Sequence, residues 1–506
     1  MAVTLPPPKK RFVSSWVQIL SQPTAIYSLV VLRIIFGLTM LWEVKRFFDN
    51  DWISQQWIEP TFHFTYEGFH WLQPWPGDGM HFHFLFLGLL AICITVGLAY
   101  RVSSALFFLG FTYTFLLEQA RYMNHFYLVV LLSFLLIFLP ANRYFSLDAK
   151  LFPSIKSKWV PRWSLLLMQI QLGLVYFFGG VAKIKADWLR GEPMRMWLAK
   201  KTDFPIVGSL FTEEWMVYIF SYGGLMIDLL AFPLLAYRKT RPFMLLALLS
   251  FHFINDRLFH IGIFPWFAIG LTTIFFFPDW PQQVYQQLKK QPALVGGAAL
   301  LTTGLARYFH GSTELFPLLI GALAGMLLAT SFSAKSSRKP APETISLTKP
   351  RYQTWVVAGF TVWFFIQIAL PLRHFFIPGN VSWTEEGHRF AWHMKLRSKK
   401  GKAIFFTHDP ATEKQEVIPI QKFLKGWQYQ KMATRPYLIR QFAQFLEQKY
   451  PDKEIRAFVE CSLNGRTRQL LVDPGVNLPT TQYRDWQHHS WIRPLREFPL
   501  SATKAK

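Results

Sequence analysis

Long apolar stretches are the feature that most constrains what this chain can fold into. A membrane-spanning helix needs about 20 consecutive, mostly apolar residues. Candidate runs of this kind lie at 24–42, 81–99, 103–117, 125–140, 163–182, 215–236, 243–255, 259–277, 294–309, 315–332 and 353–376. The short runs at 103–117, 243–255 and 294–309 fit tilted, re-entrant or bundle-buried helices as well as spans. The sequence therefore predicts a mainly α fold: a polytopic transmembrane helical bundle of about 8–11 spans.

The composition favours a membrane protein that also carries a soluble part. Apolar and aromatic residues make up 51 % of the 506 residues, and charged residues only 17 %, against about 25 % in soluble domains. A net charge of +24 would suggest nucleic acid in a soluble protein. Here basic loops facing anionic lipid explain it, so we expect membrane lipid as a partner and no nucleic acid. Cys93 and Cys461 show no metal spacing and are predicted to be free thiols.

Lys and Arg in the loops predict the orientation. With residues 1–23 in the cytoplasm, the inside segments carry more Lys and Arg than the outside segments, as the positive-inside rule requires. No small-residue cleavage site follows this tail, so it does not resemble a signal peptide. An odd number of spans then places the C-terminus outside. We predict a cytoplasmic tail at 1–23, a helical catalytic domain at 24–376 with a polar linker at 333–352, and an extracytoplasmic domain at 377–506.

The predicted outer domain combines strand and helix patterns. Alternation of apolar and polar residues predicts strands at 389–397 and 402–407, and helical periodicity predicts a helix at 434–449. Two further strands, at 454–461 and 467–472, flank Asn464-Gly465, which is a hairpin signal. We therefore expect a small α+β domain.

Ionisable residues inside apolar runs are costly in lipid and indicate pairing or function. Arg33 lies in the middle of the first run. It is predicted to pair with a carboxylate or a backbone carbonyl inside the bundle, and Asp228 is a candidate partner.

A second group of polar residues falls at the predicted outer ends of the runs. It consists of His125, Lys183, His252 and His260, beneath a domain that contains Trp392-His393-Met394. Hydrogen-bonded interfacial histidines and a snorkelling lysine would explain them without function. The functional alternative is proton chemistry, because burial at the rim of an apolar pocket favours the neutral amine of Lys183, a general base near neutral pH. No HExxH pair, Walker loop or Gly-rich dinucleotide loop is present, so no metal site is expected.

Several segments share a recognisable pattern. They are 175–189 (VYFFGGVAKIKADWL), 124–128 (NHFYL) with 141–148 (ANRYFSLD), 250–255 (SFHFIN) with 258–262 (LFHIG), and 383–394 (WTEEGHRFAWHM). In their residues and their order they resemble the vitamin K-dependent gamma-glutamyl carboxylase family, whose membrane part is a horizontally transferred transmembrane domain.

The resemblance implies an enzyme that uses reduced vitamin K, O2 and CO2. It would convert Glu in a protein or peptide to gamma-carboxyglutamate and the quinol to its epoxide. Lys183 takes the position of the family's catalytic base, and His125 and His252 take those of assisting histidines. The candidates for binding the quinone are Tyr176, Asn124, Trp392, Met394 and His260. Ala182 departs from the family pattern, which has Lys at that position, and Lys185 stands where animal members tend to be acidic.

Two other functions remain open from the sequence. One is a quinol epoxidase that does not carboxylate a peptide. The other is a non-enzymatic membrane transporter or scaffold, which the many spans and Arg33 would suit. The protein substrate, the native quinone and the oligomeric state are not determined by the sequence.

Overall fold

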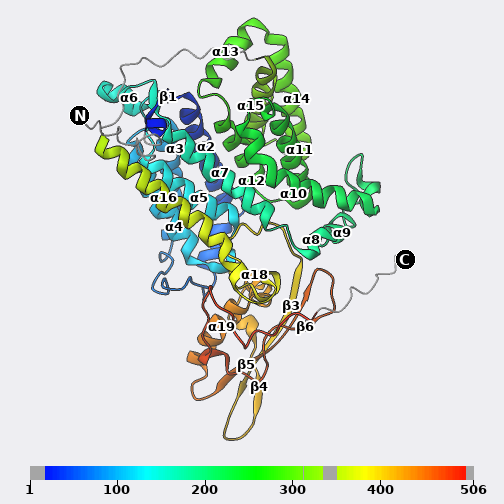
Figure 1. The fold of residues 1–506 in the computed structure, drawn as a ribbon. Coiled ribbons are helices and arrows are strands. Elements are labelled where there is room, and N and C mark those ends of the chain that lie inside the picture. Colours follow the sequence, from blue (N-terminus) through cyan, green and yellow to red (C-terminus); the bar gives the residue numbers. More distant parts are fainter. Residues whose placement is uncertain (1–17, 312, 334–349, 497–506) are drawn as a thin grey trace, which may run out of the picture.

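A computed structural model describes residues 18–311, 313–333 and 350–496 (Figure 1). The predicted tail at 1–23 and the predicted linker at 333–352 lie almost wholly outside the described residues. A helical domain and a smaller α+β domain meet at one end of the helices, which we call the cap-facing end (Figure 1).

Every predicted apolar run forms a helix. These helices are α2 (Tyr27–Asp49), α3 (Gly79–Val96), α4 (Tyr100–Leu117), α5 (Asn124–Phe138), α7 (Trp163–Val181), α10 (Glu214–Ala236), α11 (Arg241–Phe259), α12 (Phe264–Thr272) with η5 (Thr273–Phe275), α14 (Pro292–His310), α15 (Leu315–Ser333) and α16 (Pro350–Leu372). Within the described ranges, seven helices are long and apolar enough to cross a membrane: α2, α3, α4, α7, α10, α15 and α16. The predicted 8–11 spans therefore reduce to seven by length and composition. The prediction counted α5 and α12, which are shorter, and α11 and α14, which are not among the seven.

Short elements connect these helices. They are β1 (Pro23–Ala25), η1 (Ser54–Ile58), η2 (Gln119–Arg121), α6 (Leu147–Leu151), η3 (Pro153–Ile155), β2 (Trp159–Pro161), α8 (Ala186–Leu189), α9 (Met194–Leu198), η4 (Gly208–Thr212) and α13 (Trp280–Lys290). Strands β1 and β2 pair antiparallel. Helices α8 and α9 lie at the cap-facing end (Figure 1).

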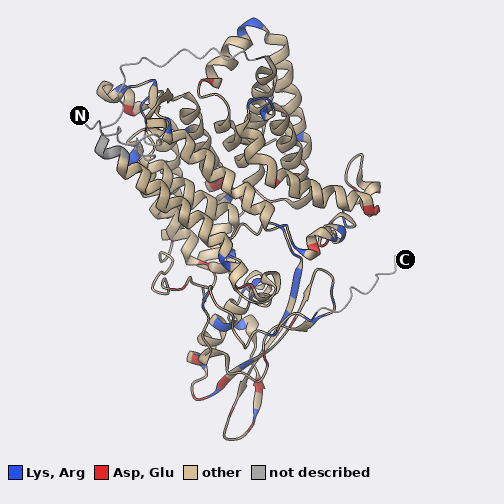
Figure 2. Cartoon of the chain, in the orientation of Figure 1, with Lys and Arg blue, Asp and Glu red and all other residues tan. Residues whose placement is uncertain are grey.

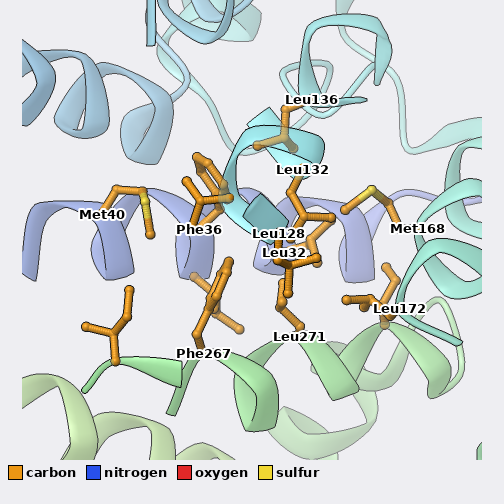
Figure 3. Packing of buried hydrophobic residues seen from close by; sticks show 14 of the residues in the cluster. Leu32, Phe36, Met40, Leu128, Leu132, Leu136, Met168, Leu172, Phe267 and Leu271 are labelled. Atoms are coloured by element: carbon orange, nitrogen blue, oxygen red, sulfur yellow. The ribbon is translucent and has the colours of Figure 1, made fainter. Parts of the chain in front are cut away.

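Helix α2 is the centre of the hydrophobic core. Its Leu32, Phe36 and Met40 pack among side chains of α5, α7 and α12 in one cluster (Figure 3). A helix surrounded on all sides must be apolar all round, which explains why its sequence shows little amphipathic pattern.

Arg33 is the exception in this core, with 0 % of its surface exposed. Its guanidinium donates to the carbonyl oxygens of Ala141 at 3.0 Å and Phe145 at 2.6 Å. The carbonyl alternative is therefore confirmed. The suggestion of Asp228 as its partner is wrong, because Asp228 pairs elsewhere.

The C-terminal domain contains a four-stranded antiparallel sheet of order β4-β3-β5-β6. After η6 (Arg373–Phe376) and α17 (Val381–Thr384), its elements are β3 (Lys399–His408), β4 (Gln415–Val417), η7 (Ile420–Lys422), α18 (Gly426–Met432), α19 (Pro436–Lys449), β5 (Glu454–Leu463), β6 (Gln469–Leu470) and η8 (Leu478–Thr480). Helix α19 buries Leu438, Ile439, Phe442 and Leu446 in the domain's core. Asn464 and Gly465 have φ of 49° and 80°, as a tight hairpin requires. The predicted α+β domain and its hairpin are confirmed.

The strand predicted at 389–397 is wrong. Phe390, Trp392 and Lys395 have positive φ, so the backbone turns repeatedly instead of extending. The alternation in the sequence has another cause. Trp392 packs into the core of the helical domain against Tyr127, at 5.1 Å between ring centroids, while its neighbours face the junction between the domains.

Polar contacts fix the two domains to each other. Arg466 in the β5–β6 turn donates to both carboxylate oxygens of Asp187 in α8, at 2.8 and 2.6 Å. Asn124 Nδ2 donates to the carbonyl oxygen of His393 at 3.1 Å. Charged residues concentrate at the ends of the helices and in the C-terminal domain, whereas the middle of the helical domain is nearly free of them (Figure 2). This distribution fits a bundle embedded in lipid.

Candidate active site

Two adjoining cavities lie at the cap-facing end. The first, here the apolar cavity, has a volume of about 360 Å³. The second, here the basic cavity, has about 800 Å³. Phe259, Ile261, Phe264, Met394 and Lys395 line both, and thus form the wall between them.

The apolar cavity lies among α7, α10 and α11. Aromatic side chains from α10 and α11, and from α8, α9 and α12, make most of its wall: Trp188, Trp197, Phe220, Phe251, Phe259 and Phe264. Gly224 leaves space, since a Cβ there would meet only Phe251, Trp188 and Lys183 Cε, at 3.8–4.0 Å. Its volume falls in the usual range of small-molecule sites, about 300–1,000 Å³. Flat aromatic ligands suit such walls.

Lys183 and Asp228 are the charged residues in this cavity's lining, apart from Lys395 in the shared wall. Lys183 Nζ forms a hydrogen-bonded ion pair with Asp228 Oδ2 and also donates to the carbonyl oxygen of Gly179 at 3.2 Å. We expected an amine without a counter-charge, so this carboxylate partner was missed. The signal was present in the sequence, because a carboxylate inside an apolar run requires a cation nearby.

Two glycines explain how the pair forms. A Cβ at Gly180 would lie 2.7 Å from Leu229 side-chain atoms, and one at Gly179 would lie 3.2 Å from Asp228 Oδ2. Helix α10 can therefore approach the end of α7 only because these residues lack side chains. This approach brings Asp228 to the lysine that follows α7.

Tyr176 and His252 form a second polar pair in the apolar cavity. The Tyr176 hydroxyl lies 3.0 Å from His252 Nε2. His252 Nδ1 is buried without a hydrogen-bond partner among the described residues. An unpaired nitrogen of this kind is costly in an apolar site, and a ligand hydroxyl or carbonyl would satisfy it. The aromatic walls, the open space at Gly224 and this nitrogen fit a bound quinol.

The basic cavity lies between the helical domain and the C-terminal domain. Nine cations line it: Arg46, Arg121, Arg389, Lys395, Arg397, Lys399, Lys400, Lys431 and Arg435. The two carboxylates in the lining, Glu43 and Glu385, already pair with Arg46 and Arg397, each at 2.6 Å. The cavity therefore has a large excess of positive charge.

Neighbouring cations in this cavity change the pKa of Lys431. Burial, and next the nearby Arg435, Arg121, Lys395 and Arg397, lower the pKa of Lys431 to about 8. Cations this close together repel one another, and a bound anion reduces that repulsion. A carboxylate-bearing ligand fits the basic cavity.

The remaining predicted site residues divide between these environments. His125, Asn124 and His260 line the basic cavity, and Met394 lies in the shared wall. Lys183 and His252 therefore share one cavity, while His125 lies in the next. Trp392 lines neither of these two cavities; it is 1 % exposed and packs within the helical core.

Sequence reasoning missed a further pair at the junction. Lys185 Nζ lies 2.9 Å from His393 Nδ1, and His393 lines the basic cavity. Burial, followed by the charge of Arg397, lowers the pKa of Lys185 to about 7. In the sequence Lys185 stands out only as a departure from a motif, and no local pattern links it to a residue 208 positions away.

Among the described residues, no three His, Cys, Asp or Glu side chains are grouped so as to hold a metal ion. Cys93 and Cys461 are free thiols, as predicted.

Two family models match the chain. Residues 21–280 match the HTTM domain. Residues 352–497 match the model described as vitamin K-dependent gamma-carboxylase, lumenal domain. No solved structure matches the chain.

Proposed function

Because the chain belongs to the vitamin K-dependent gamma-carboxylase family, we propose that it is an integral membrane enzyme that couples oxygenation of a reduced naphthoquinone to carboxylation of peptide glutamate. The observation that carries this proposal is the shared wall between an apolar cavity and a basic one. A lipid-soluble ring and an acidic peptide need opposite environments, and the reaction needs them side by side.

The apolar cavity is the proposed quinol site. When bound there, the reduced vitamin K supplies, with O2, the base strong enough to remove a glutamate γ-proton, and leaves as its epoxide. Lys183 Nζ would first give a proton to Asp228 Oδ2 across the hydrogen bond that they share, and the neutral amine would then accept a proton at Nζ. Tyr176 orients the His252 ring. The aromatic walls exclude water, which would otherwise quench a strong base.

The basic cavity is the proposed peptide site. Its excess of Lys and Arg would hold the substrate carboxylate and favour the second carboxylate that the product carries. Met394 and Lys395, which line both cavities, would lie between the quinol and the glutamate. His125 and Asn124 would face the peptide side, with His260.

The proposal is tested with the full-length protein in lipid nanodiscs. Reduced vitamin K, isotopically labelled CO2 and a Glu-containing peptide are supplied, and labelled peptide and epoxide are both measured. We expect both products from the wild type and neither from Lys183→Ala. The matched control is Lys200→Ala, since Lys200 is exposed and outside both cavities.

Other outcomes would support the alternatives. Epoxide without labelled peptide, over a range of acidic peptides, would identify an epoxidase. Neither product from a folded wild type would contradict the enzyme proposal and favour a transporter or scaffold. Full activity in Lys183→Ala would remove the proposed base.

The proposed orientation places the N-terminus in the cytoplasm and the C-terminal domain outside. A Cys93→Ser background allows thiol labelling in intact cells, because Cys461 is buried. An impermeant thiol reagent should label Thr412→Cys, in the exposed β3–β4 turn, without permeabilisation. It should label Lys150→Cys, in α6 at the opposite end, only after permeabilisation. The reverse pattern would contradict the orientation.

A further inference from the structure

Three histidines gather beside Lys185, and two of them, His388 and His393, line the basic cavity. His393 lies between His374 and His388, with 4.8 Å from its ring centroid to each of theirs. All three are buried, and His393 is only 4 % exposed. The Nε2 atoms of His388 and His393 have no hydrogen-bond partner among the described residues. Buried nitrogens without partners at a cavity wall are costly unless a ligand, a water or a moving proton uses them.

We propose that His393 and Lys185 form a proton relay that carries a proton from the basic cavity to the solution outside. The inference rests on the proposed function. The quinol-derived base takes the γ-proton of glutamate into water, and the proton that the quinol gives to the protein is left over, so each glutamate modified leaves one proton to be removed from the site. A cavity crowded with cations cannot retain that proton, because each added positive charge is repelled.

In this transfer only N–H bonds of His393 and Lys185 form and break. The His393 Nε2 lone pair takes the proton from the cavity, and the Nδ1–H proton passes to the neutral amine of Lys185, 2.9 Å away. Lys185, which is only partly buried, then gives its extra proton to water. After the ring turns its Nε2 away from the cavity, water takes the Nε2 proton and returns one to Nδ1, which restores the starting tautomer. No electrons are exchanged, and the protein returns to its original state.

The charges around the pair favour this direction. Burial, and then Lys185, His374, Arg397 and Arg373, hold the pKa of His393 well below its usual value. The pKa of Lys185 is about 7, lowered by burial and Arg397 and opposed by Glu385 and Asp187. His393 therefore passes a proton on instead of keeping it, and Lys185 exists in both forms at neutral pH. His388 is subject to the same surroundings, with its Nδ1 3.8 Å from Glu385.

His393→Ala in the full-length protein tests the relay by chemical rescue. We expect carboxylation at pH 7 to fall about 100-fold, the lower end of the usual contribution of a proton-transferring side chain. Added imidazole should restore it saturably, following the concentration of its neutral form. A purely structural role would not respond to imidazole. His70→Ala, at an exposed histidine outside both cavities, is the control. A slow variant without rescue, or a variant as fast as the wild type, would overturn the relay.

Lys185→Arg provides a second test that does not depend on removing the ring. Arginine keeps the charge but does not release its proton in this pH range, so we expect the same loss of rate. Wild-type activity in Lys185→Arg would contradict the proposal.

A third readout needs no turnover. Deuterium exchange at the C2 position of His393, followed by mass spectrometry, reports its titration. Lys185→Met should raise the pKa of His393, because a positive charge beside it is removed. An unchanged titration would overturn the coupling. An inactive wild type with this coupling intact would count against the proposed function alone.

Discussion

Lys183 and Asp228 lie 45 positions apart in the chain and form an ion pair with 7 % and 4 % of their side chains exposed. The pair lines a cavity whose walls are mostly aromatic and aliphatic. An isolated charge in such a place would destabilise the fold strongly, and the opposite charge of each residue offsets the cost of burying the other. Lys183, the proposed base, can remain buried here because Asp228 lies beside it.

Removing either partner should destabilise the protein more than removing both. Lys183→Met leaves a buried carboxylate, and Asp228→Asn leaves a buried ammonium, so each should cost about 3–5 kcal/mol in the free energy of unfolding. The double variant Lys183→Met/Asp228→Leu should be close to the wild type in stability and inactive. Unfolding in mixed micelles measures the stability, and epoxide formation the activity.

The Lys45–Asp49 pair provides the control for this cycle. Its side chains are 70 % and 48 % exposed, and exposed pairs contribute about 0–1 kcal/mol. Lys45→Met should therefore change the free energy of unfolding little. Additive losses in the Lys183/Asp228 double variant would show that the two residues do not stabilise each other.

Tyr176→Phe should impair the reaction without unfolding the protein. It removes the hydroxyl that lies 3.0 Å from His252 Nε2, and a single hydrogen bond is worth about 0.5–1.5 kcal/mol. We expect epoxide formation to fall about tenfold, because the His252 ring is no longer held in place. The free energy of unfolding should fall by only about 0.5–1.5 kcal/mol. Tyr222→Phe is the control, because its hydroxyl bonds to the Leu189 carbonyl outside both cavities. Equal effects of the two substitutions would contradict a role for the Tyr176–His252 pair.

Stability should depend on pH through Lys185. Its folded-state pKa is about 7, whereas an unfolded lysine titrates near about 10.4. Between these values the unfolded state holds the extra proton, so the free energy of unfolding rises with pH. From pH 7 to pH 10 the free energy of unfolding of the wild type should rise relative to that of Lys185→Met, by at most about 1.4 kcal/mol per pH unit. Parallel stability curves for the two proteins would show that the Lys185 pKa is not lowered.

Lys431→Met should weaken the binding of an acidic peptide. The substitution removes one cation from the excess that lines the basic cavity, and we expect about a tenfold loss of affinity, which corresponds to about 1.4 kcal/mol. The salt dependence of binding should also decrease. Fluorescence anisotropy of a labelled Glu-containing peptide measures both. Lys449→Met, at an exposed lysine in α19 outside both cavities, should leave them unchanged. Unaltered affinity in Lys431→Met would place the peptide elsewhere.

Local patterns predicted most of the secondary structure. Each apolar run became a helix, and the Asn464-Gly465 turn and α19 lie where periodicity placed them. The failure at 389–397 is instructive. Its alternation is real, but Trp392 enters the helical core and His393 lines the basic cavity. Two separate packing environments produced a pattern that a strand would also produce.

The sequence by itself determined the membrane bundle, because lipid requires every backbone polar group to be bonded within a long apolar helix, and this depends only on local composition. It also supplied the residues that bear the chemistry. Only the tertiary structure decided their partners: Asp228 for Lys183, His252 for Tyr176, and His393 for Lys185. These pairs join residues 45 to 208 positions apart. They depend on how closely the helices approach and where the C-terminal domain docks, which no local pattern records.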